Sequence, residues 1–318
     1  MNFVAALNEA AAKNLRVLEE HIGQAIAEDP FIFEACEPLF KGGKRLRPML
    51  FLLCANAKAD CPPERTMPLA TALELIHTAS LVHDDILDTS KKRRGVETAN
   101  SKYGAQIAVL VGDYLFAKAF QLVAENNYDA QVQLILSRLV KNLCVGEIMQ
   151  DRSLFEVPTM TEYYTHINLK TAIFLSSCCR LGGIVAEMDA REVENLTAYG
   201  SGLGLAFQIV DDLLDFFGDE KITGKPRGGD LKSGVITLPV IRALEVSDEA
   251  AALKKIVTGG GDVEAAIKII QATDAVDYCR TRAEAHLDSA RVNLPPTLKT
   301  SVALALEQVA DFIVDRTR

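Results

Sequence analysis

Residues 67–88 read MPLATALELIHTASLVHDDILD, and residues 203–215 read LGLAFQIVDDLLD. In both stretches the apolar residues recur at helical spacing, and both stretches end in the pattern D-D-x-x-D. On an α-helix the first and fifth residues of that pattern share a face, so two carboxylates point the same way. The two stretches therefore predict buried helices that each present acidic side chains at the C-terminal end.

These acidic clusters predict a divalent metal site. Three carboxylates within five residues repel one another, and oxygen ligands without a nearby set of His or Cys suit a hard ion such as Mg²⁺. The alternative of a solvated acidic face is disfavoured by the apolar residues before each cluster, and an EF-hand loop by the lack of its central glycine. The acids are Asp84, Asp85 and Asp88 in the first cluster and Asp211, Asp212 and Asp215 in the second.

Length and composition favour one acidic globular domain. The 318 residues carry a net charge of −9, and 49% of them are hydrophobic. No Pro/Ser/Gly-rich linker divides the chain, so we expect a single domain over residues 1–318 with one large core. The negative charge argues against a nucleic-acid partner, which would need a basic surface.

Cysteine usage and the N-terminal residues favour the cytoplasm. The seven cysteines show no C-x-x-C spacing, which is typical of free thiols in a reducing compartment. Residues 4–27 predict an amphipathic helix rather than a signal peptide. The longest apolar stretch, residues 171–188, contains Arg180 and a glycine pair and does not predict a membrane span. We expect a cytoplasmic protein, and transient contact with a membrane surface stays open for the release of an apolar product.

Helical periodicity extends over nearly the whole chain, and no alternating run of useful length predicts a strand. The expected fold class is therefore all-α. The predicted helices span residues 4–27, 47–58, 67–88, 106–125, 130–151, 163–185, 192–217, 239–244, 249–257, 263–273, 276–292 and 298–315. Proline and glycine punctuation separates them, beginning with Asp29-Pro30.

Cationic segments flank the acidic clusters. Residues 42–48, GGKRLRP, crowd three cations into a glycine-opened loop at a helix start, which suits a bound anion, although a polar surface loop is the alternative. Residues 91–95, KKRRG, follow the first cluster directly, and they either compensate its charge or grip phosphates bridged by metal ions. Lys170 enters an apolar helix, where an unpaired cation would be costly.

Two further polar residues lie near the faces of the acidic clusters. His77 precedes Asp84 by two helical turns, and Gln208 precedes Asp211 by about one turn. Acids for metal, cations for phosphate and a long apolar interior together predict an apolar diphosphate as the substrate. No Ser/His/Asp or Cys/His set, Walker A loop or G-x-G-x-x-G motif occurs, and the departure of a diphosphate needs no protein nucleophile.

With these motifs in order, the chain resembles the trans-isoprenyl diphosphate synthases, the polyprenyl synthetase family. Each motif alone is modest, but six of them in register are specific. They are GGKRLRP at 42–48, ELIHTASLVHDDILD at 74–88 with RRG at 93–95, GE at 146–147 with Gln150, KT at 170–171, FQIVDDLLD at 207–215, and GKPRGGDLKSGVITLP at 224–239. The resemblance implies the isoprenoid synthase fold, a single-domain bundle of roughly a dozen helices around a central cavity.

The resemblance also implies a role for each matching residue. Direct Mg²⁺ ligands would be Asp84, Asp88 and Asp211, supported by Asp85, Asp212 and Asp215. The diphosphate of isopentenyl diphosphate would be held by Lys44, Arg47, His77 and Arg94. The allylic diphosphate would be held by Arg93, Lys170 and Lys225. Oxygens facing the developing cation would come from Thr171 and Gln208. The chain departs from some family members at Val235, where they carry a lysine.

The implied activity is the Mg²⁺-dependent condensation of an allylic diphosphate with isopentenyl diphosphate by a homodimeric enzyme. Short-chain members of the family tend to block the product cavity with aromatics at the fourth and fifth positions before the first aspartate. Here these positions are Ser80 and Ala79, which favours an all-trans hexaprenyl to decaprenyl product (C30–C50) for quinone side chains. A shorter C15–C20 product, a class I terpene cyclase and a non-catalytic subunit of a heteromeric synthase stay open as alternatives.

Overall fold

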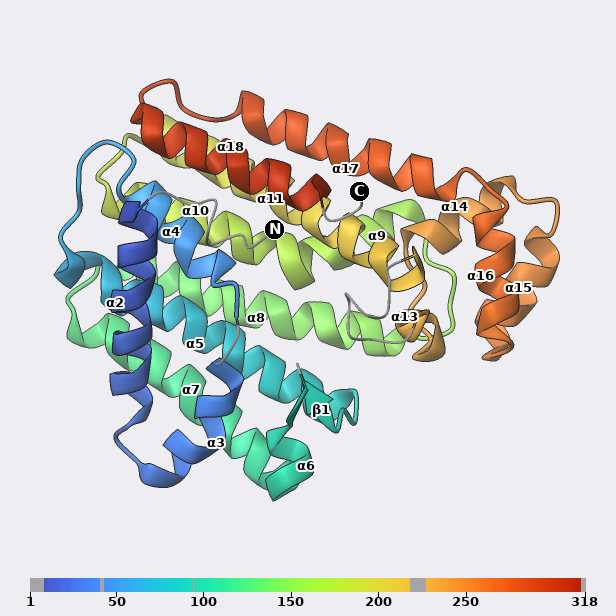
Figure 1. The fold of residues 1–318 in the computed structure, drawn as a ribbon, viewed down its shortest axis with the longest axis horizontal. Helices are drawn as coiled ribbons and strands as arrows, with labels where there is room; N and C mark the ends of the chain where they lie inside the picture. The colour runs from blue at the N-terminus through green and yellow to red at the C-terminus, as the bar shows by residue number, and fades with distance from the viewer. Residues whose placement is uncertain (1–8, 41–42, 94, 218–226, 316–318) are drawn as a thin grey trace. The chain divides into compact units, whose positions relative to one another are not determined.

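A computed structural model describes residues 9–40, 43–93, 95–217 and 227–315, and it confirms the predicted all-α fold. Within these residues the only strands are β1 (Lys92–Arg93) and β2 (Val96–Glu97), which pair as an antiparallel hairpin (Figure 1). The helices are α2 (Glu9–Ile26), α3 (Pro30–Phe40), α4 (Leu46–Ala55), α5 (Pro63–Leu87), α6 (Ala99–Tyr103), α7 (Ala105–Glu125), α8 (Ala130–Arg152), α9 (Met160–Ile167), the π-helical turn η1 (Asn168–Ala172), α10 (Ile173–Val185), α11 (Ala190–Phe217), α13 (Gly229–Lys232), α14 (Leu238–Val246), α15 (Ala250–Gly259), α16 (Val263–Gln271), α17 (Ala275–Val292) and α18 (Thr300–Asp315).

The helix α3 is an element that the sequence analysis missed. Asp29-Pro30 predicts the end of a helix, and α2 does end before these residues, at Ile26. The same two residues also begin the next helix, α3. The Asp29 Oδ1 atom accepts hydrogen bonds from the backbone N–H groups of Phe31 at 2.8 Å and Ile32 at 3.0 Å. Pro30 occupies the first helical position, where its missing N–H costs nothing.

The predicted helix over residues 163–185 is three segments in the structure. It begins earlier, at a capping box in which Thr159 Oγ1 accepts from the Glu162 N–H at 3.2 Å and Glu162 Oε2 accepts from the Thr159 N–H at 2.7 Å. After α9 the backbone widens into the π-helical turn η1 before it continues as α10. Such turns are often found at functional sites, and this one carries Lys170 and Thr171.

The chain groups into two compact units. Unit one comprises Met1–Val140, Ser177–Glu194 and Pro295–Leu306, and unit two comprises Lys141–Ser176, Asn195–Leu294 and Glu307–Arg318. The expectation of a single domain over residues 1–318 is not tested by this grouping and stays a prediction.

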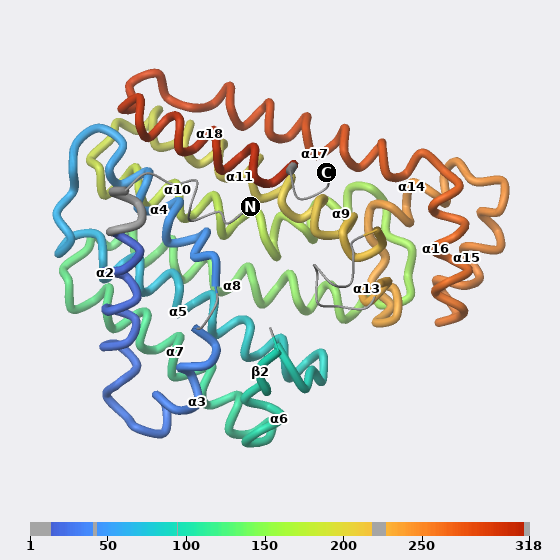
Figure 2. Tube along the Cα trace, viewed as in Figure 1, coloured from blue at the N-terminus to red at the C-terminus, as the bar shows by residue number. Residues whose placement is uncertain are grey.

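In unit one the helix α5 is central. It packs against α2, α4 and α7, and α5 and α7 run side by side (Figures 1 and 2). Because neighbours cover it from several directions, α5 is apolar nearly all round rather than along one stripe. By length and composition α7 is the one described helix that could cross a membrane, but part of its apolar surface packs against α5. The α7 residues buried there include Ala108, Val111, Leu115 and Ala119.

A close contact between α5 and α7 lies beside the first acidic cluster. A Cβ atom added at Gly112 would lie 2.1 Å from the His83 Nε2 atom, so a larger residue there would displace the His83 ring from its present position. The same Nε2 atom lies 3.2 Å from the carbonyl oxygen of Val109. This contact holds the last turn of α5 against α7, immediately before Asp84.

In unit two the helix α11 brings the second acidic cluster close to η1 and α17. Glycines on α11 make both approaches possible. A Cβ atom at Gly204 would lie 2.4 Å from the Cα atom of Ala172, and one at Gly202 would lie 2.7 Å from the carbonyl oxygen of His286. The backbone of η1 therefore touches α11 directly, and side chains of the two segments come within hydrogen-bonding distance.

Substitution of Gly204 by alanine is expected to destabilise the protein, because the new methyl group meets backbone that cannot rotate away. Overpacking of this kind costs about 1–3 kcal/mol of unfolding free energy. Gly23→Ala is the matched control, since it lies within α2 and no atom lies within 4 Å of its added Cβ. The control should gain about 0.5–1 kcal/mol from helix propensity alone. Denaturant titration followed by circular dichroism measures both, and a stabilised Gly204→Ala variant would contradict the close approach of η1 and α11.

Candidate active site

The first acidic cluster forms the last turn of α5. The backbone N–H of Asp88 donates to the carbonyl oxygen of Asp84 at 2.8 Å, so the helical turn continues through the whole cluster. Asp84 is half-buried and Asp88 is exposed, whereas Asp85 is only 1% exposed. A helix C-terminus carries a partial negative charge, which adds to the repulsion among the three carboxylates. The turn therefore requires nearby cations.

Arg93 supplies one of these cations. Its Nε atom donates to Asp85 Oδ1 at 2.9 Å and Oδ2 at 3.1 Å, and its Nη2 lies 2.9 Å from Oδ1. The pairing ties the β1–β2 hairpin to the end of α5. The cationic run after the cluster thus compensates charge at this position. The predicted contact between Arg93 and the allylic diphosphate stays a prediction.

The second acidic cluster forms the last turns of α11. As in the first cluster, the second aspartate is buried and the first is more exposed. Asp211 is exposed, whereas Asp212 is 2% exposed and accepts from Tyr163 OH and Gln208 Nε2, each at 2.7 Å. Asp215 accepts from the backbone N–H groups at the start of α13, Gly229 at 3.1 Å and Asp230 at 3.2 Å. In both clusters the second aspartate faces the protein interior.

The two hydrogen bonds to Asp212 oppose a desolvation cost. Burial raises the pKa of the Asp212 carboxyl well above its ordinary value, as does the charge of Asp230, while the bonds from Gln208 and Tyr163 lower it. Burial and the neighbouring Asp212 raise the pKa of the Tyr163 hydroxyl. Tyr163 was not identified from the sequence. No local pattern marks it, because its partner lies 49 residues away on α11.

The turn η1 brings together the KT and GE motifs and the face of the second cluster. Thr171 Oγ1 donates to Gln208 Oε1 at 2.6 Å. Lys170 Nζ donates to Gln150 Oε1 at 2.8 Å and lies 3.3 Å from Glu147 Oε2. Motifs that are widely separated in sequence, at 146–150, 170–171 and 207–215, therefore converge within unit two.

A cavity of about 410 Å³ lies beside these residues. Its lining includes Gln150, Tyr163, His166 and Val235. Burial, with a contribution from Lys170, lowers the pKa of His166 to about 4, so this ring is neutral at physiological pH. Val235 contributes an apolar wall to this cavity.

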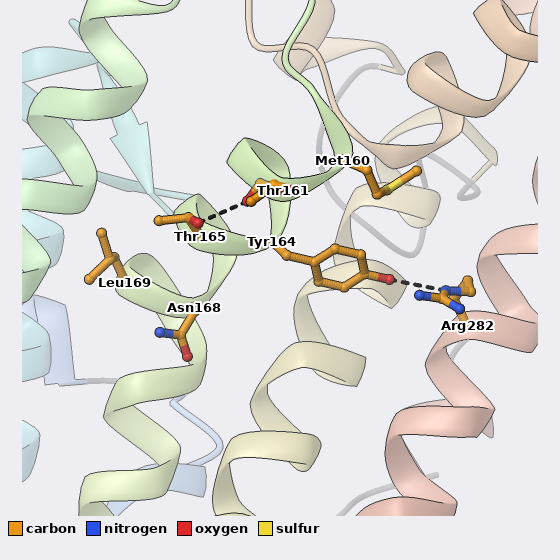
Figure 3. Close-up of a pocket in the computed structure, with 7 residues that line it drawn as sticks. All are labelled: Met160, Thr161, Tyr164, Thr165, Asn168, Leu169 and Arg282. Atoms are coloured by element: carbon orange, nitrogen blue, oxygen red, sulfur yellow. Dashed lines mark hydrogen bonds between the residues drawn. The ribbon is translucent and has the colours of Figure 1, made fainter.

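A larger open depression, of about 560 Å³, lies on the other side of α9. Figure 3 shows Tyr164 and Arg282 across it, with Arg282 Nε donating to the Tyr164 hydroxyl at 3.2 Å. None of the residues predicted for the site lines this depression. It is therefore not the candidate active site.

In unit one the three cations of the segment GGKRLRP differ in burial: Arg45 is buried, whereas Lys44 and Arg47 are more exposed. Arg45 is 6% exposed, and its guanidinium group bonds Glu19 Oε1 at 2.7 Å and Glu74 Oε1 at 2.8 Å, as well as the carbonyl oxygen of Phe40. Arg45 is thus a buried anchor. Its neighbours Lys44, which is exposed, and Arg47, which is half-buried, remain the anion-binding candidates.

The anchor holds Arg47 close to α5. Arg47 Nη1 lies 3.2 Å from His77 Nε2, so two of the residues predicted for isopentenyl diphosphate are in contact. Glu74, one turn before His77, is 4% exposed; burial raises its pKa, while Arg45 and Arg47 lower it. Glu74 was not identified from the sequence, although an acid inside an apolar helix is a signal for a buried ion pair.

The predicted chain-length residues lie on α5. Ala79 is fully buried, and Ser80 is half-buried with its hydroxyl donating to the carbonyl oxygen of His77 at 2.8 Å. Ser80 is therefore the position where a larger side chain has more room. Two predicted contacts, Arg94 and Lys225, lie outside the described residues.

The assignment of Asp84, Asp88 and Asp211 as metal ligands stays a prediction. Asp84 and Asp88 belong to unit one and Asp211 belongs to unit two. Within the part of the chain that the structure describes, no three His, Cys, Asp or Glu side chains gather into a metal-binding group. This still fits Mg²⁺, which proteins usually hold by one or two carboxylates together with water and substrate phosphates.

Comparison with known proteins finds similarity along most of the chain. A family model described as Polyprenyl synthetase matches residues 29–273. A decaprenyl diphosphate synthase from Rhodobacter capsulatus superposes with a TM-score of 0.90 at 36% identity, covering 98% of both chains. A polyprenyl synthase from Caulobacter crescentus, complexed with calcium and isoprenyl diphosphate, has a TM-score of 0.88 at 33% identity and covers 98% of this chain and 97% of its own. A short chain isoprenyl diphosphate synthase from Methanocaldococcus jannaschii is 39% identical over 239 residues, which is 74% of this chain and 73% of the relative.

Replacement of Arg45 by methionine is expected to lower the unfolding free energy by about 3–5 kcal/mol, because it leaves Glu74 buried without its main partner. Arg65→Met is the matched control: Arg65 pairs with Glu187 at 2.9 Å, but both side chains are exposed. Its effect should stay within about 1 kcal/mol. The double variant Arg45→Met/Glu74→Leu should recover most of the loss, since the buried charge is gone. Denaturant titration measures all three, and equal small effects of Arg45→Met and Arg65→Met would contradict the anchor role.

Proposed function

Because the chain belongs to the polyprenyl synthetase family, we propose that it is a Mg²⁺-dependent trans-prenyltransferase that extends an allylic diphosphate with isopentenyl diphosphate. The observation that carries the proposal is the matching division within the two acidic clusters. The second aspartate of each is held by protein donors, and the first lies at or near the surface. Asp88, the third aspartate of the first cluster, is also exposed, so three acids are presented for metal: Asp84, Asp88 and Asp211.

The metal requirement follows from the chemistry of these ligands. Carboxylate oxygens suit Mg²⁺, and the diphosphate would complete its coordination. When bound, Mg²⁺ supplies Lewis-acid assistance to the leaving diphosphate. The Caulobacter relative, complexed with calcium and isoprenyl diphosphate, supports a divalent ion with a prenyl diphosphate in this family.

Different side chains bind the two diphosphates. Lys170, Arg93 and Lys225 hold the allylic diphosphate, and Lys44, Arg47, His77 and Arg94 hold that of isopentenyl diphosphate. The allylic C–O bond breaks, and the electron pair leaves with the diphosphate. The double bond of isopentenyl diphosphate then forms the new C–C bond, and a proton passes to the departed diphosphate. Thr171 and Gln208 face the allylic cation with oxygen atoms, which stabilise its positive charge.

A long product is favoured over a short one. Ala79 and Ser80 are small, and the decaprenyl synthase neighbour supports a C30–C50 product for quinone side chains. The short-chain relative from Methanocaldococcus keeps a C15–C20 product as the second candidate. The product length decides between them.

We further propose a cytoplasmic homodimer. None of the seven cysteines, all of which lie in the described part of the chain, forms a disulfide, which suits a reducing compartment. On α7 the side chains of Val109 and Leu110 are 42% and 57% exposed, and a second copy of the chain would cover them. A heteromeric partner in place of the second copy is the alternative, and transient contact with a membrane surface during product release is part of the proposal.

The proposal is tested by incubating the purified protein alone with Mg²⁺, farnesyl diphosphate and labelled isopentenyl diphosphate. Condensation should require the metal. Asp84→Asn and Asp211→Asn should each lower kcat by more than the 10–100-fold typical of residues that only support a metal site. Asp248→Asn, an exposed acid in the loop after α14, is the control and should turn over normally. Metal-independent condensation, or normal turnover by either cluster variant, would contradict the metal assignment. An inactive wild type that gains activity with a second polypeptide would support the heteromeric alternative.

Substitution of Ser80 by phenylalanine should shorten the product from C30–C50 toward C15–C20. The ring fills space that the growing tail needs, while the acids one turn later on α5 are untouched. Ser137→Phe is the control, since the Ser137 hydroxyl bonds a carbonyl three residues earlier, as the Ser80 hydroxyl does, but its side chain is exposed. Chromatography of the dephosphorylated products reads the chain length. An unchanged length in Ser80→Phe would show that the tail does not pass this position.

A further inference from the structure

Four polar side chains in unit two form one continuous hydrogen-bonded series. Thr171 Oγ1 donates to Gln208 Oε1 at 2.6 Å, and Gln208 Nε2 donates to Asp212 Oδ1 at 2.7 Å. Tyr163 OH donates to the other oxygen of the same carboxylate, Asp212 Oδ2, at 2.7 Å. Tyr163 and Asp212 are each 2% exposed, Thr171 is 5% exposed and Gln208 is half-buried, so the series is largely shielded from water.

The chemistry of the carboxylate sets the direction of the series. Both Asp212 oxygens act as acceptors, so the glutamine must turn its NH₂ group toward the acid and its carbonyl oxygen toward Thr171. A flipped amide would place the carbonyl oxygen against the carboxylate and leave both of these acceptors without a donor. Tyr163 keeps the carboxylate in place for this arrangement, because it occupies the second oxygen.

The backbone explains how one segment supplies both ends of the series. Tyr163 and Thr171 stand eight residues apart on the continuous segment α9–η1, and Gln208 and Asp212 stand one turn apart on α11. In a regular α-helix, eight residues leave two side chains about 80° apart. The extra residue accommodated by a π-helical turn takes up one step of about 100°, which returns both side chains to nearly the same face. The turn η1 therefore lets Tyr163 and Thr171 both reach α11.

Tyr163 is itself held firmly. Its backbone N–H donates to the carbonyl oxygen of Thr159, the residue of the capping box, at 3.0 Å. Its ring packs edge-on against Tyr164, with the ring centroids 5.4 Å apart. The phenol is thus fixed from the backbone side and from the ring side before it meets Asp212.

We propose that Tyr163 is a positioning residue that acts through Asp212 to fix the side-chain amide of Gln208. It thereby holds the oxygen atoms of Gln208 and Thr171 in the orientation that meets positive charge on the allylic substrate. This inference rests on the proposed function for its consequence in catalysis, and on the hydrogen-bonded series alone for its structural part. Loss of the Tyr163 hydroxyl should slow the chemical step and leave the binding of both diphosphates, which other residues hold, nearly unchanged.

The kinetic test compares Tyr163→Phe with Tyr164→Phe. Tyr164 is the matched control, because its hydroxyl bonds Arg282 in the open depression and has no part in the series (Figure 3). Tyr163→Phe should lower kcat by about 10–100-fold, with little change in KM for either substrate, whereas Tyr164→Phe should match the wild type. A wild-type kcat in Tyr163→Phe, or a loss that appears mainly in KM, would overturn the positioning role.

A spectroscopic test measures directly whether Tyr163 fixes the Gln208 amide, and it does not depend on enzyme turnover. Protein labelled with ¹⁵N-glutamine gives a side-chain NH₂ signal for Gln208, assigned by its absence from a Gln208→Leu variant. That signal should move and exchange faster with water in Tyr163→Phe, and stay in place in Tyr164→Phe. An unmoved signal in Tyr163→Phe would overturn the inference, whatever the enzyme makes. If the wild type forms no prenyl product but the signal moves as expected, the proposed function fails while the positioning by Tyr163 stands.

Discussion

The repulsion among carboxylates at the C-terminal ends of two largely buried helices is the constraint on which the rest of the site depends. A helix end that already carries partial negative charge cannot hold three acids without compensation. The structure compensates the negative charge in the same way at both clusters. It turns the second aspartate inward onto protein donors, Arg93 for Asp85 and the Tyr163–Gln208 pair for Asp212. The first aspartate of each cluster is left at or near the surface, where a metal ion would neutralise it.

Three irregular elements of the fold each bring a side chain to a polar or acidic partner. The β1–β2 hairpin is the one strand pair of the described chain, and it delivers Arg93 to Asp85. The π-helical turn η1 interrupts an otherwise regular helix and delivers Thr171 to Gln208. The left-handed backbone of Arg45, with φ of 50°, opens α4 and sends its guanidinium group to Glu74. Departures from regular geometry thus coincide with positions where a charged or polar side chain needs a partner.

The sequence predicted the regular parts of this molecule better than the irregular ones. Periodicity identified most of the long helices, and the D-D-x-x-D spacing located the acids on helix ends, because both signals are local. It could not tell Arg45 from Lys44 and Arg47, since the partners that bury Arg45 lie 26 and 29 residues away. Tyr163 and the turn η1 were missed for the same reason: contacts with α11 define them. The roles of Asp84, Asp88 and Asp211 as metal ligands are still a prediction from family resemblance.

The most direct test of this account is a crystal structure of the protein with Mn²⁺ in place of Mg²⁺ and a non-reactive allylic diphosphate analogue, with the metal located by anomalous scattering. We expect carboxylate oxygens of Asp84, Asp88 and Asp211 in the coordination spheres, at about the 2.0–2.1 Å expected for Mg²⁺ or slightly longer. We also expect Asp85 to keep its bonds to Arg93 and Asp212 to keep its bonds to Tyr163 and Gln208. A structure in which Asp85 or Asp212 leaves these partners and coordinates the metal directly would contradict this expectation.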